Sequence, residues 1–215
     1  MSEPALSRQE QKEQTREALL DAALELSQEA GFAQVSLRQV ARAAGVVPTA
    51  FYRHFDSMDE VGLALVERSF ATLRRLMRNA QRDPDLVTDL ISTSIDVLVT
   101  SVKENREHFA FVARERLGGS APVRDAIHRE LELFVSETAV AIRLLPVVSS
   151  WTIDDVMALS GLFVRNMVFR AEQVLAMPPG RTDLEADLKR TMRREMLMIV
   201  VGVANWRSDG AVGSA

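Results

Sequence analysis

The 215-residue sequence contains no cysteine. This absence excludes disulfide bonds, thiolate metal sites and cysteine nucleophiles, and it is consistent with a reducing compartment. The longest apolar run near the C-terminus, residues 196–204, is nine residues long, whereas a membrane-spanning helix needs about 20. The first residues show neither the basic nor the apolar segment of a secretory signal. We therefore expect a cytoplasmic protein with no membrane partner.

Glycine and proline are also sparse, with 10 and 7 residues, and most of them fall between long amphipathic stretches. No sustained alternation of polar and apolar residues is present, which argues against strands. The pattern predicts an all-α fold of about nine helices. The expected helices cover residues 8–29, 37–44, 48–55, 57–80, 85–103, 105–117, 121–145, 153–177 and 183–206.

Carboxylates are absent from residues 30–55, although the chain as a whole carries a net charge of −4. The same window contains Arg38, Arg42, Arg53 and His54. A polyanion responds to the local electrostatic field rather than to the total charge of the chain. This window is therefore the candidate surface for nucleic acid.

The same window has the signals of two short helices joined by a tight turn. Ser36 is a favourable N-cap, Gly45 lies where the turn needs a left-handed residue, and Pro48 suits the first position of the second helix. This arrangement is typical of a helix-turn-helix, whose second helix enters the major groove of DNA. An αα-hairpin with a few exposed arginines would give a similar spacing.

The second helix of this pair divides into two faces. Phe51 and Phe55 are four residues apart, so they share one face and are expected to anchor the helix. Thr49, Tyr52 and Arg53 then point outward with Pro48. Tyrosine can donate to phosphate, arginine can bind guanine in a bidentate pair, and threonine can contact a thymine methyl group.

Residues 35–55, which run from Val-Ser-Leu-Arg-Gln-Val to Phe-Tyr-Arg-His-Phe, resemble the N-terminal domain of the TetR family of bacterial regulators. The resemblance implies an N-terminal three-helix DNA-binding domain and a C-terminal helical bundle. By position it implies phosphate contacts for Ser36 and Tyr52, a supporting role for His54, a base or phosphate contact for Arg38, and a groove-facing set of Val47, Pro48, Thr49 and Arg53. Met58 stands where many members have a phosphate-binding lysine, which Arg8, Lys12 or Arg16 would have to replace.

Several further segments resemble repressors of unsaturated fatty acid synthesis and of fatty acid desaturation, among them residues 48–55, 59–63, 73–78 and 114–116. This resemblance implies a long-chain acyl-CoA, or a related thioester, as effector and no cofactor. The candidate lining residues are Phe70, Leu73, Met77, Phe109, Val112, Leu133, Phe134, Phe163, Met167 and Phe169. Each of them also reads as an ordinary core residue. Arg114, Arg116 and Arg124 are either headgroup contacts or structural salt-bridge partners.

We expect a DNA-binding domain over residues 1–56, a ligand-binding and dimerisation domain over residues 57–207, and a disordered tail over residues 208–215. The segment Met196 to Ala204 is apolar nearly all round, which suits a helix buried against a second copy. Gly161 and Gly202 would allow close helix approach. A two-fold dimer would present two recognition helices to a palindromic operator.

An enzyme and a metal site are not expected. His54, His108 and His128 are not at metal-ligand spacing, and the last two are predicted to be satisfied surface residues. No phosphate-binding loop or nucleophile elbow is present. The hypothesis is a bacterial, ligand-responsive repressor that associates with the nucleoid when it binds DNA as a homodimer. The alternatives are a multidrug-sensing repressor of efflux genes and a lipid-binding or dimerisation module that binds no DNA.

Overall fold

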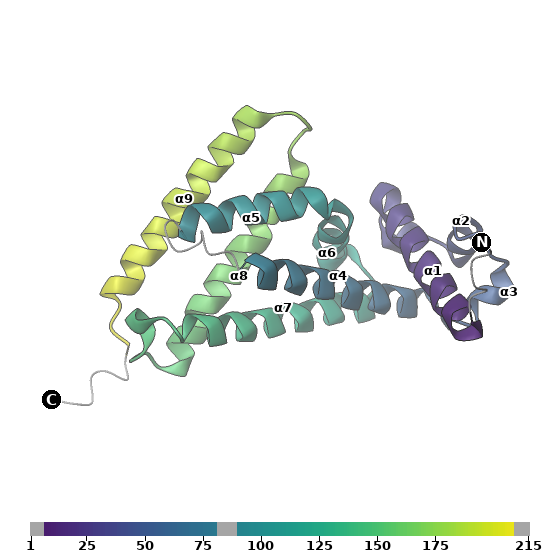
Figure 1. The fold of residues 1–215 in the computed structure, drawn as a ribbon, viewed down its shortest axis with the longest axis horizontal. Helices are drawn as coiled ribbons and strands as arrows, with labels where there is room; N and C mark the ends of the chain where they lie inside the picture. The colour runs from purple at the N-terminus through teal and green to yellow at the C-terminus, as the bar shows by residue number, and fades with distance from the viewer. Residues whose placement is uncertain (1–6, 81–89, 209–215) are drawn as a thin grey trace, which may run out of the picture. The chain divides into compact units, whose positions relative to one another are not determined.

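The computed structural model describes residues 7–80 and 90–208, and all regular elements in these ranges are helical (Figure 1). This confirms the predicted all-α fold class. The α-helices are α1 (Arg8–Ala30), α2 (Leu37–Ala43), α3 (Pro48–Phe51), α4 (Met58–Ala80), α5 (Leu90–Glu104), α6 (Arg106–Gly118), α7 (Ala121–Ile142), α8 (Ile153–Ala176) and α9 (Thr182–Asn205). Two short 3₁₀ helices, η1 (Phe32–Gln34) and η3 (Pro146–Val148), complete the described elements.

The chain divides into two compact units. The first comprises residues 1–73 and 107–128, and the second comprises residues 74–106 and 129–215. The first unit thus contains the predicted helix-turn-helix together with most of α4, nearly all of α6 and the start of α7. The predicted domain boundary after residue 56 does not coincide with the boundaries of these compact units. The division into a DNA-binding domain and a ligand-binding domain therefore stays a prediction about function.

The core of the first unit is built from apolar residues at helical spacing. α1 contributes Leu19, Leu20 and Ala23, and α4 contributes Val61, Leu65 and Phe70, all of them fully or almost fully buried. Burying each large aliphatic or aromatic side chain contributes roughly 1.5–3 kcal/mol, so these residues contribute substantially to the stability of the unit.

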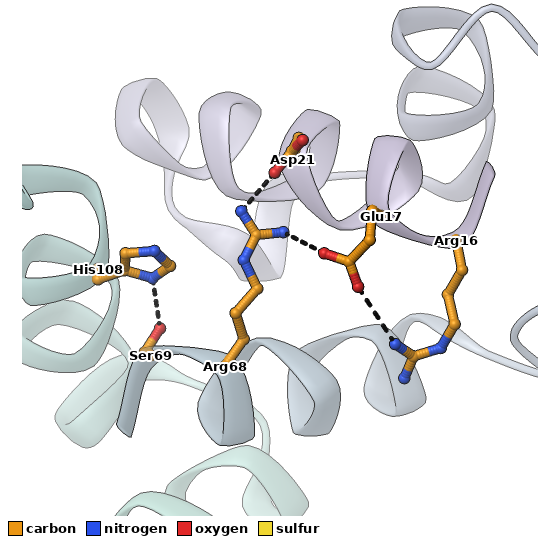
Figure 2. A network of polar contacts seen from close by, with 6 residues as sticks. All are labelled: Arg16, Glu17, Asp21, Arg68, Ser69 and His108. Atoms are coloured by element: carbon orange, nitrogen blue, oxygen red, sulfur yellow. Dashed lines mark hydrogen bonds and ion pairs between the residues drawn. The ribbon is translucent and has the colours of Figure 1, made fainter. Parts of the chain in front are cut away.

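A polar network that is partly exposed at Arg68 and buried at Ser69 connects α4 to α1 and α6 (Figure 2). The guanidinium of Arg68 on α4 donates to Glu17 Oε2 at 3.3 Å and also to Asp21, both on α1. The next residue, Ser69, has its hydroxyl oxygen 3.0 Å from Nδ1 of His108 on α6. His108 is buried, so the prediction that it lies at the surface is wrong. Its burial follows from its position on the same α6 face as Phe111 and Glu115.

In the second unit, α5 packs against both α8 and α9, which run in roughly opposite directions (Figure 1). Ile95, Val99 and Val102 are its buried residues with the lowest exposure. α8 and α9 are also joined by polar contacts, because Glu195 accepts hydrogen bonds from Arg170 and, at 3.3 Å, from Asn166. A separate cluster of Ala139, Val148, Trp151 and Val156 lies around η3.

The structure moves a few of the predicted boundaries. α3 ends at Phe51 rather than near residue 55, because the amides of Arg53 and His54 bond to carbonyls three residues back rather than four. Ser208, the first residue of the predicted tail, is buried and its hydroxyl accepts a hydrogen bond from the amide of Thr152 at 2.8 Å. Residues 209–215, the rest of that tail, lie outside the described part of the chain.

None of the helices formed by the described residues combines the length and the apolar character that crossing a bilayer requires.

Candidate nucleic-acid interface

The first short helix of the pair, α2, begins with a reciprocal cap. The hydroxyl of Ser36 accepts from the amide of Gln39 at 3.3 Å, while the side-chain oxygen of Gln39 accepts from the Ser36 amide at 2.9 Å. The sequence predicted Ser36 as the cap and missed Gln39, although a serine followed three residues later by glutamine is the capping-box signal. The Ser36 hydroxyl also donates to Gln39 at 2.7 Å, so a phosphate oxygen would compete with this bond.

The turn after α2 depends on Gly45, whose φ is +70°. The amide of Gly45 donates to Arg42 O at 3.1 Å, and the amide of Val46 donates to Ala41 O at 2.9 Å. This pair of bonds is the Schellman motif, which needs a left-handed residue at this position. The prediction for Gly45 is confirmed, and the turn directs the chain straight into α3.

The helix α3 is held by aromatic side chains. Phe51 and Phe55 are both buried, their ring centroids are 5.8 Å apart, and the guanidinium of Arg16 on α1 lies 5.1 Å from the Phe55 ring. Pro48 is the first residue of the helix, where its missing amide hydrogen costs nothing. The spacing of the two phenylalanines therefore fixes which side of α3 faces the protein.

The opposite side of α3 is open to solvent. Val47 and Tyr52 are 63% and 60% exposed, and Pro48, Thr49 and Arg53 are exposed with them. Ser36 and Arg38 at the start of α2 are exposed as well, whereas His54 is half-buried. The exposed valine, tyrosine and arginine can make both apolar and charged contacts. The predicted reading residues thus lie on α2, α3 and the residues next to them.

His54 lies among cations. Partial burial is the first cause that lowers the pKa of its imidazole below the ordinary value, and the positive charges of Lys12, Arg16 and Arg53 lower it further. Its Nδ1 is buried and has no hydrogen-bond partner among the residues that the structure describes. The imidazole is therefore biased toward its neutral form, and an approaching anion would reverse that bias.

The α1 cations near His54 differ in their availability. Arg16 packs on the Phe55 ring and lies 3.7 Å from Glu17 Oε1 (Figure 2), whereas Lys12 is exposed. Met58, the first residue of α4, is half-buried and has no charge to offer a phosphate. Lys12 acts on His54 with its positive charge and has an exposed side chain. It is therefore the preferred replacement for the phosphate contact that Met58 cannot make.

The predicted effector residues are distributed over both units. Phe70, Leu73, Phe109 and Val112 belong to the first unit, while Leu133, Phe134, Phe163, Met167 and Phe169 belong to the second. Phe70, Val112 and Phe134 are buried, but Leu133 and Phe169 are each 52% exposed. The side chain of Met77 lies outside what the structure describes. These residues are not brought together in one unit by the part of the chain described.

The three arginines considered for an effector headgroup have structural partners. Arg114 Nη1 donates to the carbonyls of Ser27 and Gln28 at 2.7 and 3.1 Å, and Arg124 Nη1 donates to the carbonyl of Gly119 at 2.6 Å. Arg116 is half-buried and also interacts within the protein. For Arg114 and Arg124 these contacts favour a structural role over a headgroup contact. Their partners are backbone carbonyls rather than the carboxylates of a salt bridge.

Within residues 7–80 and 90–208, histidine and carboxylate side chains do not gather into a group of three that could hold a metal ion. The described site therefore consists of hydrogen-bond donors, cations and apolar groups on two short helices.

Residues 19–65 match the model of the family described as bacterial regulatory proteins, tetR family. Solved structures with the same fold include a protein assigned to the TetR-family transcriptional regulators from Syntrophomonas wolfei, with 15% identity, a TM-score of 0.69 and coverage of 91% of this chain and 99% of that one. The fatty acid degradation regulator FadR from Bacillus halodurans has 13% identity and a TM-score of 0.66, covering 90% and 97%. The multidrug binding protein EbrR has 18% identity and a TM-score of 0.58, covering 83% and 93%.

Proposed function

We propose that this chain is a ligand-responsive DNA-binding regulator of the tetR family rather than an enzyme, and that it acts as a homodimeric repressor that reads a palindromic operator and responds to a long-chain acyl thioester. The observation that carries the DNA-binding part is the solvent-open side of α3, where Val47, Tyr52 and Arg53 are exposed over a helix anchored by buried phenylalanines. Tyrosine and arginine side chains that are open to solvent on an anchored helix can reach phosphates and base edges.

For the DNA contacts we propose distinct roles. Arg53 reads a guanine edge, Thr49 and Val47 make apolar groove contacts, and Arg38 contacts a base or phosphate. Tyr52 and Ser36 contact phosphates with support from His54, while Pro48 packs along the groove. Lys12 supplies the phosphate contact that Met58 does not. The lack of any carboxylate in residues 30–55 keeps this surface compatible with a polyanion.

The dimer is supported by the outer surfaces of α8 and α9. Apart from Phe169, which is a candidate effector contact, their exposed large apolar residues are Ile153, Met157, Leu162, Leu184, Leu197, Met198, Val200 and Val201. A groove of about 580 Å³ on α9 is lined by Leu197, Met198 and Val201 together with three arginines. Gly202 has open space beside it, so a helix of a second copy can approach closely. A two-fold axis would use this surface on both copies.

For the effector we propose a long acyl chain, with apolar side chains among those predicted from the sequence as its contacts. Burial of an alkyl chain is worth about 0.8 kcal/mol for each methylene, so mostly apolar side chains are enough to bind it. The fold similarity to a protein named as a fatty acid degradation regulator supports this class, whereas the similarity to a multidrug binding protein supports the alternative. The genes under control are proposed to be those of fatty acid desaturation and unsaturated fatty acid synthesis.

The mechanism is a population shift. The effector favours one spacing of the two DNA-binding domains in the dimer, and only one spacing fits successive major grooves. The helix α4 begins just after α3 and includes residues of both compact units, which makes it the proposed lever.

The test of this function has two steps. Native mass spectrometry of the purified protein identifies any retained ligand, and an operator is then selected from random duplex DNA with the full chain. Its affinity is compared in the presence of a saturated and an unsaturated long-chain acyl-CoA. The proposal expects the two acyl chains to change the operator affinity differently. Equal affinity with both would refute the acyl effector, and a retained cationic drug would favour the multidrug alternative.

The pH dependence of DNA binding should show whether His54 is protonated when the operator binds. Its pKa is lowered in the free protein by burial and by neighbouring cations, and a phosphate beside it would raise that pKa again. Binding would then take up a proton, so the operator affinity should rise by a few fold as the pH falls from about 7.5 to about 6.

The stability of the free protein should change in the opposite direction. A lowered pKa in the folded state means that protonation favours the unfolded chain. The stability contributed by neutral His54 is therefore present above the unfolded value of about 6.5 and is lost as the pH falls through the folded pKa. The variant His54→Gln should remove this part of both pH dependences, while His128→Gln, at an exposed site on α7, should preserve them. An unchanged binding profile in His54→Gln would contradict the assigned role.

A further inference from the structure

The C-terminal end of α1 is capped by a residue of α6. Arg114 Nη1 donates to the carbonyls of Ser27 and Gln28 at 2.7 and 3.1 Å. The carbonyl of Ser27 also accepts from the amide of Gly31 at 3.0 Å, and the last carbonyls of a helix together carry the negative end of its dipole. α1 has no basic residue in its own last turn, so Arg114 supplies the positive charge there.

The neighbouring residue on α6 holds the chain on the other side of the same junction. Glu115 is 2% exposed, and its Oε1 accepts from the amide of Phe32 at 3.0 Å. Phe32 is the first residue of η1, where the amide has no partner within the helix. Two consecutive side chains of α6 therefore bind the carbonyls before Gly31 and the amide after it.

Gly31 is required between these two contacts. Its φ is +84°, a conformation that other residues rarely adopt. A Cβ at this position would lie only 3.3 Å from Cδ of Arg114 and 3.8 Å from Oε1 of Glu115. The junction is therefore specified by backbone conformation and by close approach at the same time.

The same junction is packed by Phe32. Its ring meets the ring of Phe111 on α6 edge to face at 5.8 Å, and a Cβ on Gly62 of α4 would lie 2.8 Å from its Cε1. The start of η1 is thus in contact with α4 and α6. Four residues later Ser36 caps the N-terminus of α2, so the placement of Phe32 bears directly on the placement of the helix-turn-helix.

Glu115 destabilises the folded protein at this position. Its Oε2 is buried and has no hydrogen-bond partner in residues 7–80 and 90–208. A buried carboxylate with one oxygen unsatisfied costs stability, so maximal stability does not account for it. Its contact with the Phe32 amide is directional, which points to a role in orientation.

We infer that Arg114 and Glu115 are positioning residues for DNA binding, which hold the α1–η1 junction so that the position of α6 sets the position of α2 and α3. Phe109 and Val112, two of the proposed effector contacts, lie on the same helix less than two turns away. A movement of α6 would reach the DNA-binding helices through this junction. The inference rests on the proposed function, because it assigns these residues to its regulation.

The experiment uses the full chain and four variants. Glu115→Met removes the acceptor at similar volume, Glu115→Gln keeps an acceptor for Phe32, and Arg114→Met removes the cap on α1. Arg129→Met, at an exposed position on α7, is the matched control. Operator affinity is measured well below the melting temperature of every variant. Hydrogen exchange is followed by mass spectrometry in peptides that contain Phe32 and α2.

Glu115→Met and Arg114→Met are expected to weaken operator binding about tenfold, which corresponds to about 1.4 kcal/mol, and to speed exchange at the junction. Glu115→Gln and Arg129→Met should remain within about twofold of the parent protein, which is below about 0.5 kcal/mol. The inference is overturned if Glu115→Met binds like the parent, or if Glu115→Gln loses as much as Glu115→Met.

Failure of the proposed function gives a different result. In that case the parent protein enriches no DNA sequence from the random pool. The role in DNA binding then fails with it, and exchange decides separately whether the junction holds α2: faster exchange through α2 in Glu115→Met but not in Glu115→Gln supports that structural part, and equal exchange in both overturns it.

Discussion

Replacing Tyr52 and Arg53 together with alanine is expected to weaken operator binding by at least about 30-fold, because two contacts worth about 1–3 kcal/mol each are lost. Both side chains are exposed, so their removal takes little from the core. The melting temperature and effector binding should therefore stay close to those of the parent protein. Fluorescence anisotropy with the selected operator, at two salt concentrations, measures the loss.

The two single variants should separate base reading from phosphate contact. Arg53→Ala should relax the preference at one position of the operator, whereas Tyr52→Ala should weaken binding to all sequences by a similar factor. Arg75→Ala, at an exposed position on α4, serves as the control. Unchanged affinity in the double variant would refute this reading surface. A parent protein that binds lipid but selects no DNA would instead favour the module without DNA binding.

The second large effect is expected at the proposed dimer surface. Leu197→Glu combined with Val201→Glu should convert the dimer to a monomer at micromolar concentration, as measured by sedimentation velocity. The two-fold axis repeats each substitution, so four carboxylates would have to be buried without partners. Each of them costs several kcal/mol when it is buried without a partner in an apolar contact.

The same variant should lose nearly all operator affinity, because a single recognition helix lacks the second half-site. Its helix content should be preserved, since Leu197 and Val201 are exposed in the single chain. Leu144→Glu, which replaces an equally apolar exposed residue between α7 and η3, should leave the dimer intact. A dimer that survives the α9 substitutions would place the interface elsewhere.

Local signals were sufficient for the DNA-binding segment. The serine before α2, the glycine in its Schellman turn and the proline that opens α3 each act within about four residues, so the sequence shows them directly. The spacing of Phe51 and Phe55 decided which side of α3 is buried for the same reason. The end of α3 was less predictable, because 3₁₀ and α-helical bonding differ little in energy over one turn.

Long-range partners were not predictable. His108 was expected at the surface, yet Ser69, 39 residues away, meets its ring in a buried contact. Arg114 was a candidate for a headgroup or a carboxylate and instead caps a helix that ends 84 residues earlier. A charged residue on a helix has many partners of equal chemistry within its reach, and only the packing of the helices chooses among them.

The sequence by itself thus determined the all-α class, the turn between α2 and α3, and the absence of carboxylates from residues 30–55. All three follow from composition or from interactions between near neighbours in the chain. The tertiary structure decided the neutral bias of His54, the bridge from Arg68 to α1, and the junction of Arg114 and Glu115 with Gly31. Each of these depends on distances between helices. A burial pattern in the sequence shows which face of a helix is covered, but it does not give the distance to the helix that covers it.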